Sequence, residues 1–171
     1  PSALPCGMAK VAPSTDGTYG NECGWEAVGY DGRHTSIEGF ANLHEFQIGG
    51  LLFSPTTGKL QVTPGSLENP HEGFPSRFDR KDEFATAGYY SVLLKDYNVK
   101  AELTATERVG FHRYTFPQSE QSNIIFSIGR QLGESGLAVD SKVTFVGGNR
   151  LEGFVTTKPE YVKKYQADAV V

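Results

Sequence analysis

Several features that mark large classes of protein are scarce in this 171-residue sequence. The two cysteines, Cys6 and Cys23, are too few to define a disulfide scaffold; they form either one bridge in an oxidising compartment or two free, partly buried thiols. No apolar stretch exceeds a few residues, whereas a transmembrane helix needs about 20. The 16 basic residues form no cluster, and the formal net charge is −4. The sequence therefore predicts neither a membrane span nor a surface for nucleic acid or anionic lipid.

The motifs of several catalytic classes are also missing. No Gly-x-Ser-x-Gly nucleophile elbow occurs, and the glycine pairs at 49–50 and 147–148 lack the Lys-Ser/Thr that follows a phosphate-binding loop. None of the histidines has the close spacing of a metal site; they are His34, His44, His71 and His112. No motif therefore indicates nucleophilic, nucleotide-dependent or metal-dependent catalysis.

Aromatic and turn-forming residues, by contrast, are abundant. The sequence has 11 Phe, 8 Tyr and 1 Trp, together with 20 Gly and 9 Pro. Many aromatics with frequent turn residues favour short strands over helices. The length suits one domain. We therefore predict a single all-β domain over residues 1–171, folded as an antiparallel two-sheet β-sandwich.

The clearest strand pattern lies in residues 98–106. Apolar and polar residues alternate there, with Val99, Ala101, Leu103 and Ala105 on one face and Lys100, Glu102 and Thr104 on the other. This period of two predicts one buried and one solvated face, with a partner strand at 89–95 across a turn at 96–98. Other strands are expected at 39–41, 48–53, 59–63, 108–116, 123–128, 141–146 and 150–157, with turns at 54–58 and 147–149 and an exposed loop at 64–80.

The single tryptophan belongs to the densest group of unusual residue types, in segments 24–34 and 44–47. Aromatic rings stack on the apolar faces of sugars, while carboxylate, imidazole and guanidinium groups bind their hydroxyls. The composition thus indicates a sugar site; alternatively, the rings pack at a sandwich edge and the charges are solvated. The candidate residues are Trp25, Tyr30, Arg33, His34, His44 and Glu45.

Several segments between about residues 5 and 130 resemble a known family. The longest are Gly-Tyr-Tyr-Ser-Val-Leu-Leu-Lys-Asp-Tyr-Asn-Val-Lys-Ala-Glu-Leu-Thr-Ala-Thr at 88–106 and Arg-Val-Gly-Phe-His-Arg-Tyr-Thr-Phe-Pro at 108–117. Shorter ones are Pro-Cys-Gly-Met at 5–8, Ala-Pro-Ser-Thr at 12–15, Ile-Glu-Gly-Phe at 37–40 before His44, and Ser-Arg-Phe at 76–78 before Glu83. Together they resemble the N-terminal domain of glycoside hydrolase family 92, the calcium-dependent exo-α-mannosidases.

The resemblance implies a β-supersandwich that precedes an (α/α)₆ barrel absent from this sequence. In the family, the barrel supplies the general acid, the general base and the calcium ligands, so we expect this chain to hold no catalytic residue and no calcium. Its expected role is to shape one wall of an α-1,2-mannosidase-like, inverting cleft and to pack on the barrel. The alternatives are a stand-alone carbohydrate-binding sandwich and a purely structural module.

The resemblance also bears on individual residues and on location. Trp25 takes the place of an aromatic wall of the mannose pocket, and His44 matches a family histidine; Tyr30, Arg33, His34 and Glu45 are either pocket or surface residues. We expect a periplasmic or secreted protein whose export signal is absent from the sequence. Because the sequence opens at Pro1 and stops directly after a charged stretch, we expect it to be a fragment.

The sequence departs from the family pattern in three segments near the presumed site. Glu-Phe-Gln-Ile-Gly at 45–49 replaces Leu-Ser-Gly-Thr-Gly, Gly-Tyr-Asp-Gly at 29–32 replaces Gly-Tyr-His-Tyr, and Phe-Asp-Arg at 78–80 replaces Phe-Ser-His. The expected strands match the family well. The departures therefore concern sugar and linkage specificity more than the fold.

Overall fold

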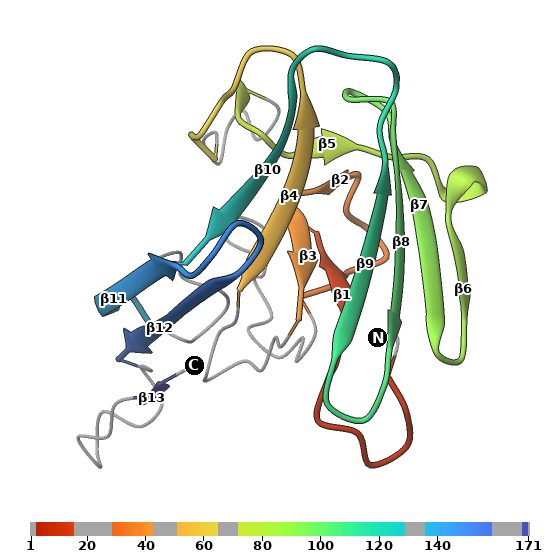
Figure 1. Ribbon diagram of the computed structural model, residues 1–171. Coiled ribbons are helices and arrows are strands. Elements are labelled where there is room, and N and C mark those ends of the chain that lie inside the picture. Colours follow the sequence, from red (N-terminus) through yellow and green to blue (C-terminus); the bar gives the residue numbers. More distant parts are fainter. Residues whose placement is uncertain are drawn as a thin grey trace.

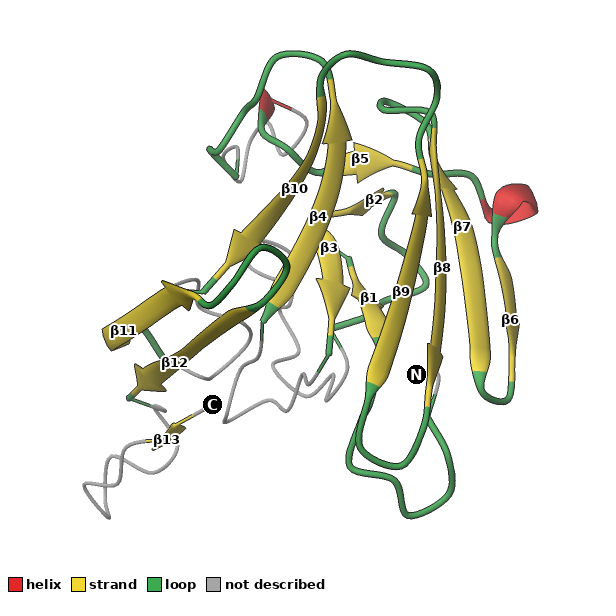
Figure 2. Cartoon of the chain, in the orientation of Figure 1, coloured by secondary structure: helices red, strands yellow, loops and turns green. Residues whose placement is uncertain are grey.

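The computed structural model describes residues 3–15, 29–42, 51–64, 72–128, 136–158 and 169–170. It confirms the predicted all-β class: two four-stranded antiparallel sheets lie face to face (Figures 1 and 2). The first sheet has the order β1 (Ala12–Ser14), β3 (Gly39–Ala41), β4 (Leu52–Thr57) and β10 (Ser122–Ser127). The second has the order β6 (Phe84–Thr86), β7 (Tyr89–Leu94), β8 (Val99–Ala105) and β9 (Gly110–Thr115).

Smaller elements lie at the borders of the two sheets. A two-stranded ribbon and a short 3₁₀ helix precede the second sheet, and a hairpin with one further strand follows the first sheet's last strand. They are β2 (Ser36–Ile37) with β5 (Ser76–Arg77), η2 (Arg80–Asp82), and β11 (Ala138–Phe145) with β12 (Leu151–Thr157) and β13 (Ala169–Val170). None of the helices in the described part of the chain has the length and apolar character needed to cross a membrane.

The hydrophobic core lies between the two sheets, and β8 supplies much of it. Its apolar residues point inward, as the alternation predicts, while Lys100 and Thr104 are exposed. Glu102 differs from the expectation, because it is only 8% exposed on the outer face. The core residues are Val11, Ile37, Phe40, Phe78, Tyr90, Val92, Leu94, Val99, Ala101, Leu103 and Ala105.

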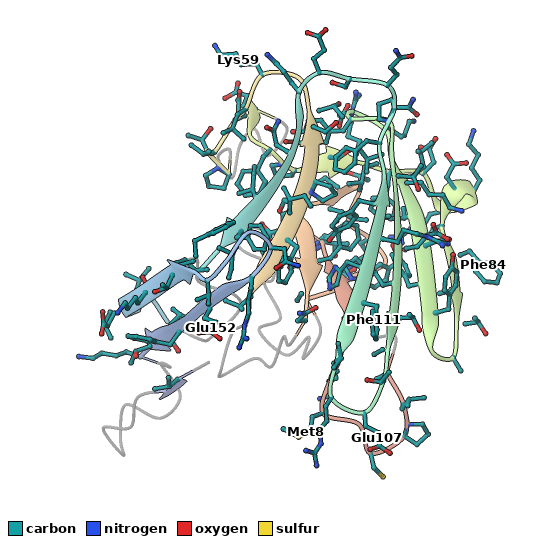
Figure 3. All side chains as sticks on the ribbon, in the orientation of Figure 1. Met8, Lys59, Phe84, Glu107, Phe111 and Glu152 are labelled. Atoms are coloured by element: carbon teal, nitrogen blue, oxygen red, sulfur yellow. The ribbon has the colours of Figure 1, made fainter. Side chains whose placement is uncertain are left out.

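Glu102 is covered by its neighbours on the outer face of the second sheet. Tyr89 donates to its Oε1 at 2.6 Å, and Arg113 donates to its two carboxylate oxygens at 2.7 and 2.8 Å. These hydrogen bonds, with Arg113 contributing most, lower the pKa of Glu102 to about 2. Phe84 and Phe111, labelled in Figure 3, are more than half exposed and lie on the same face. We call the group formed by Tyr89, Glu102 and Arg113 the sheet-face network.

Across the core, β9 contacts the first sheet through a histidine. The rings of His112 and Phe53 are 5.1 Å apart. His112 Nε2 is hydrogen-bonded to the Asn42 side chain, and its Nδ1 lies 2.8 Å from the Tyr114 hydroxyl. Burial lowers the pKa of His112 from 6.5 to about 4. The imidazole is therefore a neutral link between the two sheets at neutral pH.

Two sequence predictions around β4 are wrong. Residues 54–57 continue the strand instead of turning, and the reversal begins at Gly58, whose φ is +81°. Pro55 is tolerated within the strand because β3 pairs only with Leu52 and Phe53. In the described part of the chain, Pro55 thus has a paired neighbour on the β10 side alone. Residues 59–63 form no strand, and residues 48–50 of the expected strand lie outside the described part.

The remaining turn predictions agree better with the structure. Asn98 (φ +51°) and Gly147 (φ +66°) have the left-handed conformation that tight hairpin turns require. The prediction of an exposed loop at 64–80 is wrong for its last part, because residues 74–76 are buried and Ser76–Arg77 form β5, while residues 65–71 lie outside the described part. Cys6 carries a free, exposed thiol, and Cys23 lies outside the described residues.

Candidate functional site

Three of the six candidate residues lie in one loop of the structure. Tyr30, Arg33 and His34 belong to loop 29–34, which leads into β2. The other three candidates lie outside the described residues: Trp25, His44 and Glu45. The site is therefore built here from loop 29–34 and the side chains that contact it.

The loop is folded locally by an aspartate turn. The Asp31 carboxylate accepts a hydrogen bond from the Arg33 backbone N–H at 2.7 Å and also binds the Arg33 guanidinium. The Asp31 carbonyl accepts from the His34 N–H at 3.1 Å, and Gly29 has a φ of +67° that suits glycine. The hydrogen bonds from Arg33 hold the pKa of Asp31 well below its usual range. An ion pair on the surface thus closes the loop.

Thr15, which directly follows β1, anchors one side of the loop. Its side chain is fully buried, and its Oγ1 accepts from the Asp31 N–H at 2.8 Å and donates to the Gly29 carbonyl at 3.2 Å. The Thr15 carbonyl lies 2.6 Å from His34 Nδ1. Because a carbonyl oxygen only accepts, Nδ1 carries the hydrogen and Nε2 of the neutral ring remains an acceptor. Thr15 therefore sets both the position and the tautomer of His34.

Arg80, at the start of η2, holds the opposite side of the loop. Its Nη2 donates to the carbonyls of Gly32 at 2.6 Å and His34 at 3.2 Å, with that of Asp31 at 3.4 Å. Its Nη1 donates to the Tyr30 hydroxyl and, at 2.9 Å, to Glu83. The guanidinium carbon also lies 5.2 Å from the centre of the Tyr30 ring. One side chain thus binds four residues of the loop.

Glu83 connects this arrangement to the core. The Tyr30 hydroxyl lies 3.0 Å from both of its carboxylate oxygens, and the Tyr90 hydroxyl donates to Oε1 at 2.7 Å. Tyr90 is a core residue of β7, and the Glu83 side chain is only 12% exposed. Burial, followed by the Glu83 carboxylate, raises the pKa of both tyrosines. We call Tyr30, Arg80, Glu83 and Tyr90 the loop-anchoring network.

The three described candidates differ in their hydrogen bonds and in their exposure. The Tyr30 hydroxyl is bound within the loop-anchoring network, and the Arg80 guanidinium lies against its ring. The Arg33 side chain is 73% exposed beside Asp31. His34 is half-buried and keeps Nε2 as an acceptor. One loop thus brings together an aromatic ring, a guanidinium and an imidazole, which are groups of the kind that binds sugars.

Sequence reasoning missed the residues that hold the loop in place. None of the four is among the candidate residues: Thr15, Glu83 and Tyr90 belong only to segments that resemble the family, and Arg80 to one that departs from it. The sequence does contain one signal for the contact between Arg80 and the loop. Both Arg80 and residues 29–32 belong to segments that depart from the family pattern, and in the structure these two segments contact each other.

The described residues contain no metal site of the expected kind. Among them, no three His, Cys, Asp or Glu side chains come together as a metal site. The carboxylates nearest the loop are already bound, Asp31 by Arg33 and Glu83 by Arg80 and two tyrosines. The calcium that the resemblance implies is therefore assigned to no described residue of this chain.

The sequence and the structure are both similar to those of known proteins. The sequence profile of the glycosyl hydrolase family 92 N-terminal domain matches residues 1–168. The structure is similar to the family GH92 α-mannosidase BT3965 from Bacteroides thetaiotaomicron, with a TM-score of 0.82 and 31% identity over 92% of this chain and 21% of that chain. It is also similar to the family 92 glycosyl hydrolase ccman5, with a TM-score of 0.71 and 26% identity over 99% of this chain and 22% of that one.

A third structure agrees in fold alone. The inverting mannosidase BT2199 from Bacteroides thetaiotaomicron has a TM-score of 0.64 and 22% identity, over 91% of this chain and 18% of that chain. No curated protein matches the sequence. The chain spans about a fifth of the length of the solved structures it resembles. From the profile match over nearly its whole length, the chain belongs to glycosyl hydrolase family 92, as an N-terminal domain of that family.

Proposed function

We propose that the chain is the N-terminal part of an exported α-mannosidase and that loop 29–34 forms one wall of its substrate cleft. The supporting observation is the 31% identity with the α-mannosidase BT3965 across 92% of the chain. A second structure of BT3965 is a complex with mannoimidazole, and this chain is 32% identical to it over 93% of its own length. The proposed substrate is an α-linked mannoside, with an α-1,2 linkage as the first to test.

The catalytic steps belong, in this proposal, to the part of the enzyme that the sequence lacks. Inverting hydrolysis needs an acid and a base on opposite sides of the glycosidic bond, about 6.5–9.5 Å apart. We propose that both groups, and the calcium ion, belong to the barrel that the resemblance implies. Loop 29–34 contributes binding: the Tyr30 ring, Arg33 and the His34 acceptor hold the sugar while the barrel performs the chemistry.

An open apolar side of the sandwich supports the proposed packing on the barrel. Among the described strands, β10 pairs only with β4, and its residues Ile124 and Phe126 are 43% and 46% exposed. Beside them lies a cavity of about 170 Å³ between β4, β10 and the β11–β12 hairpin, whose Val143 and Leu151 are also exposed. The hairpin is marked by Glu152 in Figure 3. Exposed apolar surface next to an unpaired strand edge is typical of a surface covered by another part of the protein.

The proposal is tested by comparing the full-length protein with the 171-residue chain. With calcium present, we expect the full-length protein to release mannose from α-1,2-mannobiose with the β-anomer as the first product, observed by proton NMR. A β-linked mannobiose is the matched control, and chelation of calcium should abolish the activity.

Two results would contradict the proposal in different ways. Mannose release by the 171-residue chain alone would place catalysis in this domain. An inactive full-length protein whose isolated chain still binds mannobiose, read from Trp25 fluorescence, would favour a stand-alone carbohydrate-binding module.

A further inference from the structure

Loop 29–34 is held from outside by residues that are not themselves in the loop. We propose that Arg80 and Glu83 are positioning residues, which fix this loop in the conformation that binds the mannoside. The inference rests on the proposed function, because it assigns to the loop the recognition of substrate. It adds to that function two residues, 46 to 53 positions away in sequence from the loop residues they contact.

The first argument is the geometry around Arg80. Its two terminal nitrogens donate to three loop carbonyls, to the Tyr30 hydroxyl and to Glu83. A guanidinium presents its donors as a rigid, planar fork, whereas a lysine ammonium is a compact point charge on a flexible stem. Lysine keeps the charge at position 80 but lacks the second nitrogen that binds the loop carbonyls. An Arg80→Lys change is therefore expected to release the loop while preserving the charge near Glu83.

The second argument is the connection to the core. Glu83 accepts hydrogen bonds from Tyr90, which is 6% exposed in β7, and from Tyr30 in the loop. A continuous set of hydrogen bonds therefore runs from a core strand through Glu83 and Arg80 to the loop backbone. Because β7 is paired on both sides, by β6 and β8, it is a rigid reference for the loop's position.

The third argument is that backbone pairing does not replace these contacts. No strand pairing is described within residues 29–34, since β2 begins only at Ser36. The backbone contact described between the loop and the end of β1 is one hydrogen bond of 2.8 Å from the Thr15 N–H to the Gly29 carbonyl. The loop conformation thus depends on its own turn, on Thr15 and on the loop-anchoring network. A binding loop held in its bound form loses less conformational entropy when the ligand binds, and this gain appears as affinity.

The experiment uses the full-length enzyme and measures kcat and KM for α-1,2-mannobiose, together with the thermal midpoint. For Arg80→Lys and Glu83→Gln we expect KM to rise by about tenfold, while kcat stays within about twofold. The matched control is Arg113→Lys, which changes the arginine that binds Glu102 in the sheet-face network. The control should leave KM unchanged.

A second readout separates positioning from general stabilisation. Hydrogen exchange of the backbone amides in 29–34 should accelerate in Arg80→Lys, while exchange in β7 and β8 stays as in the wild type. If Arg80→Lys does not fold, Tyr30→Phe removes one hydroxyl from the same network and is read by the same two measurements.

The outcomes distinguish this inference from the function on which it rests. A wild-type enzyme that releases no mannose overturns the proposed function, and the inference with it. An active wild type with a KM that is unchanged in Arg80→Lys and Glu83→Gln overturns the inference alone. A lower thermal midpoint with unchanged KM and unchanged loop exchange also overturns it, since the two residues would then be merely structural.

Discussion

The chain contains two arginine–glutamate–tyrosine networks with similar chemistry and different connections. In the sheet-face network, Arg113, Glu102 and Tyr89 lie on neighbouring strands that the backbone ladder of the second sheet already joins. In the loop-anchoring network, Arg80 and Glu83 connect η2, a core strand and a loop that has no described strand pairing. A backbone hydrogen bond of 2.8 Å from the Thr15 N–H to the Gly29 carbonyl joins that loop to the end of β1. We therefore expect a side-chain hydrogen bond to stabilise the fold more where no strand pairing joins the same segments.

The largest effect is expected for Glu83→Ala. This change leaves two tyrosine hydroxyls and the Arg80 guanidinium without their shared acceptor in a half-buried site. Removing one partner of such a group costs about 3 kcal/mol of unfolding free energy. Urea denaturation of the protein measures it, with Glu102→Ala as the matched change in the sheet-face network. An equal loss of unfolding free energy in the two variants would contradict the expected difference between the two networks.

The second-largest effect on stability is expected for His112, which connects the two sheets, whereas the sheet-face network lies within one sheet. Its folded pKa, about 4, is below the ordinary 6.5 because the ring is buried. The neutral ring therefore contributes fully to the unfolding free energy above pH 6.5. This contribution, on the order of 2 kcal/mol, is lost as the pH falls from 6.5 through 4. Stability measured across this range should fall less steeply in His112→Gln. A slope identical to that of the wild type would count against this interpretation.

The parts of the fold that sequence reasoning predicted are those with local signals. In β8 the alternation of apolar and polar residues predicts the strand, and the residue types at Asn98 and Gly147 predict the turns. Each of these signals lies within a few neighbouring residues. Pro55 misled the prediction, since its turn preference is overridden by pairing with β10, a strand almost 70 residues away. Local pattern cannot show that a neighbouring strand ends early and leaves room for a proline.

In the candidate site, too, a local signal marks the loop residues, whereas the residues that anchor the loop have no such signal. The residue types in loop 29–34 indicated sugar binding because composition is visible along the chain. Its anchors were not visible, since Glu83 lies 53 residues from Tyr30 and Arg80 lies 48 residues from Gly32. Only the folded chain brings them together, and nothing periodic in the sequence marks such contacts.

A smaller effect is expected for Thr15→Val, which tests the other anchor of the loop. Valine has nearly the same shape, but it leaves the Asp31 N–H without its acceptor, at a cost of about 1 kcal/mol. The Thr15 carbonyl still holds His34, so the loss should be well below that of Glu83→Ala. The measurement is again urea denaturation. A loss as large as that of Glu83→Ala would make Thr15, and not the loop-anchoring network, the main support of the loop.

The smallest effect is expected for Glu102→Gln in the sheet-face network. The ladder that joins β7, β8 and β9 stays intact without the charge, so the thermal midpoint at neutral pH should change little. The pH dependence supplies the sharper test. With a folded pKa of about 2, Glu102 stabilises the fold fully above its ordinary pKa of 4.5 and loses this contribution as the pH falls through 2. The variant should therefore lack part of the wild-type decline between pH 4.5 and 2, whereas a large loss already at pH 7 would mean that the ladder does not hold these strands without Glu102.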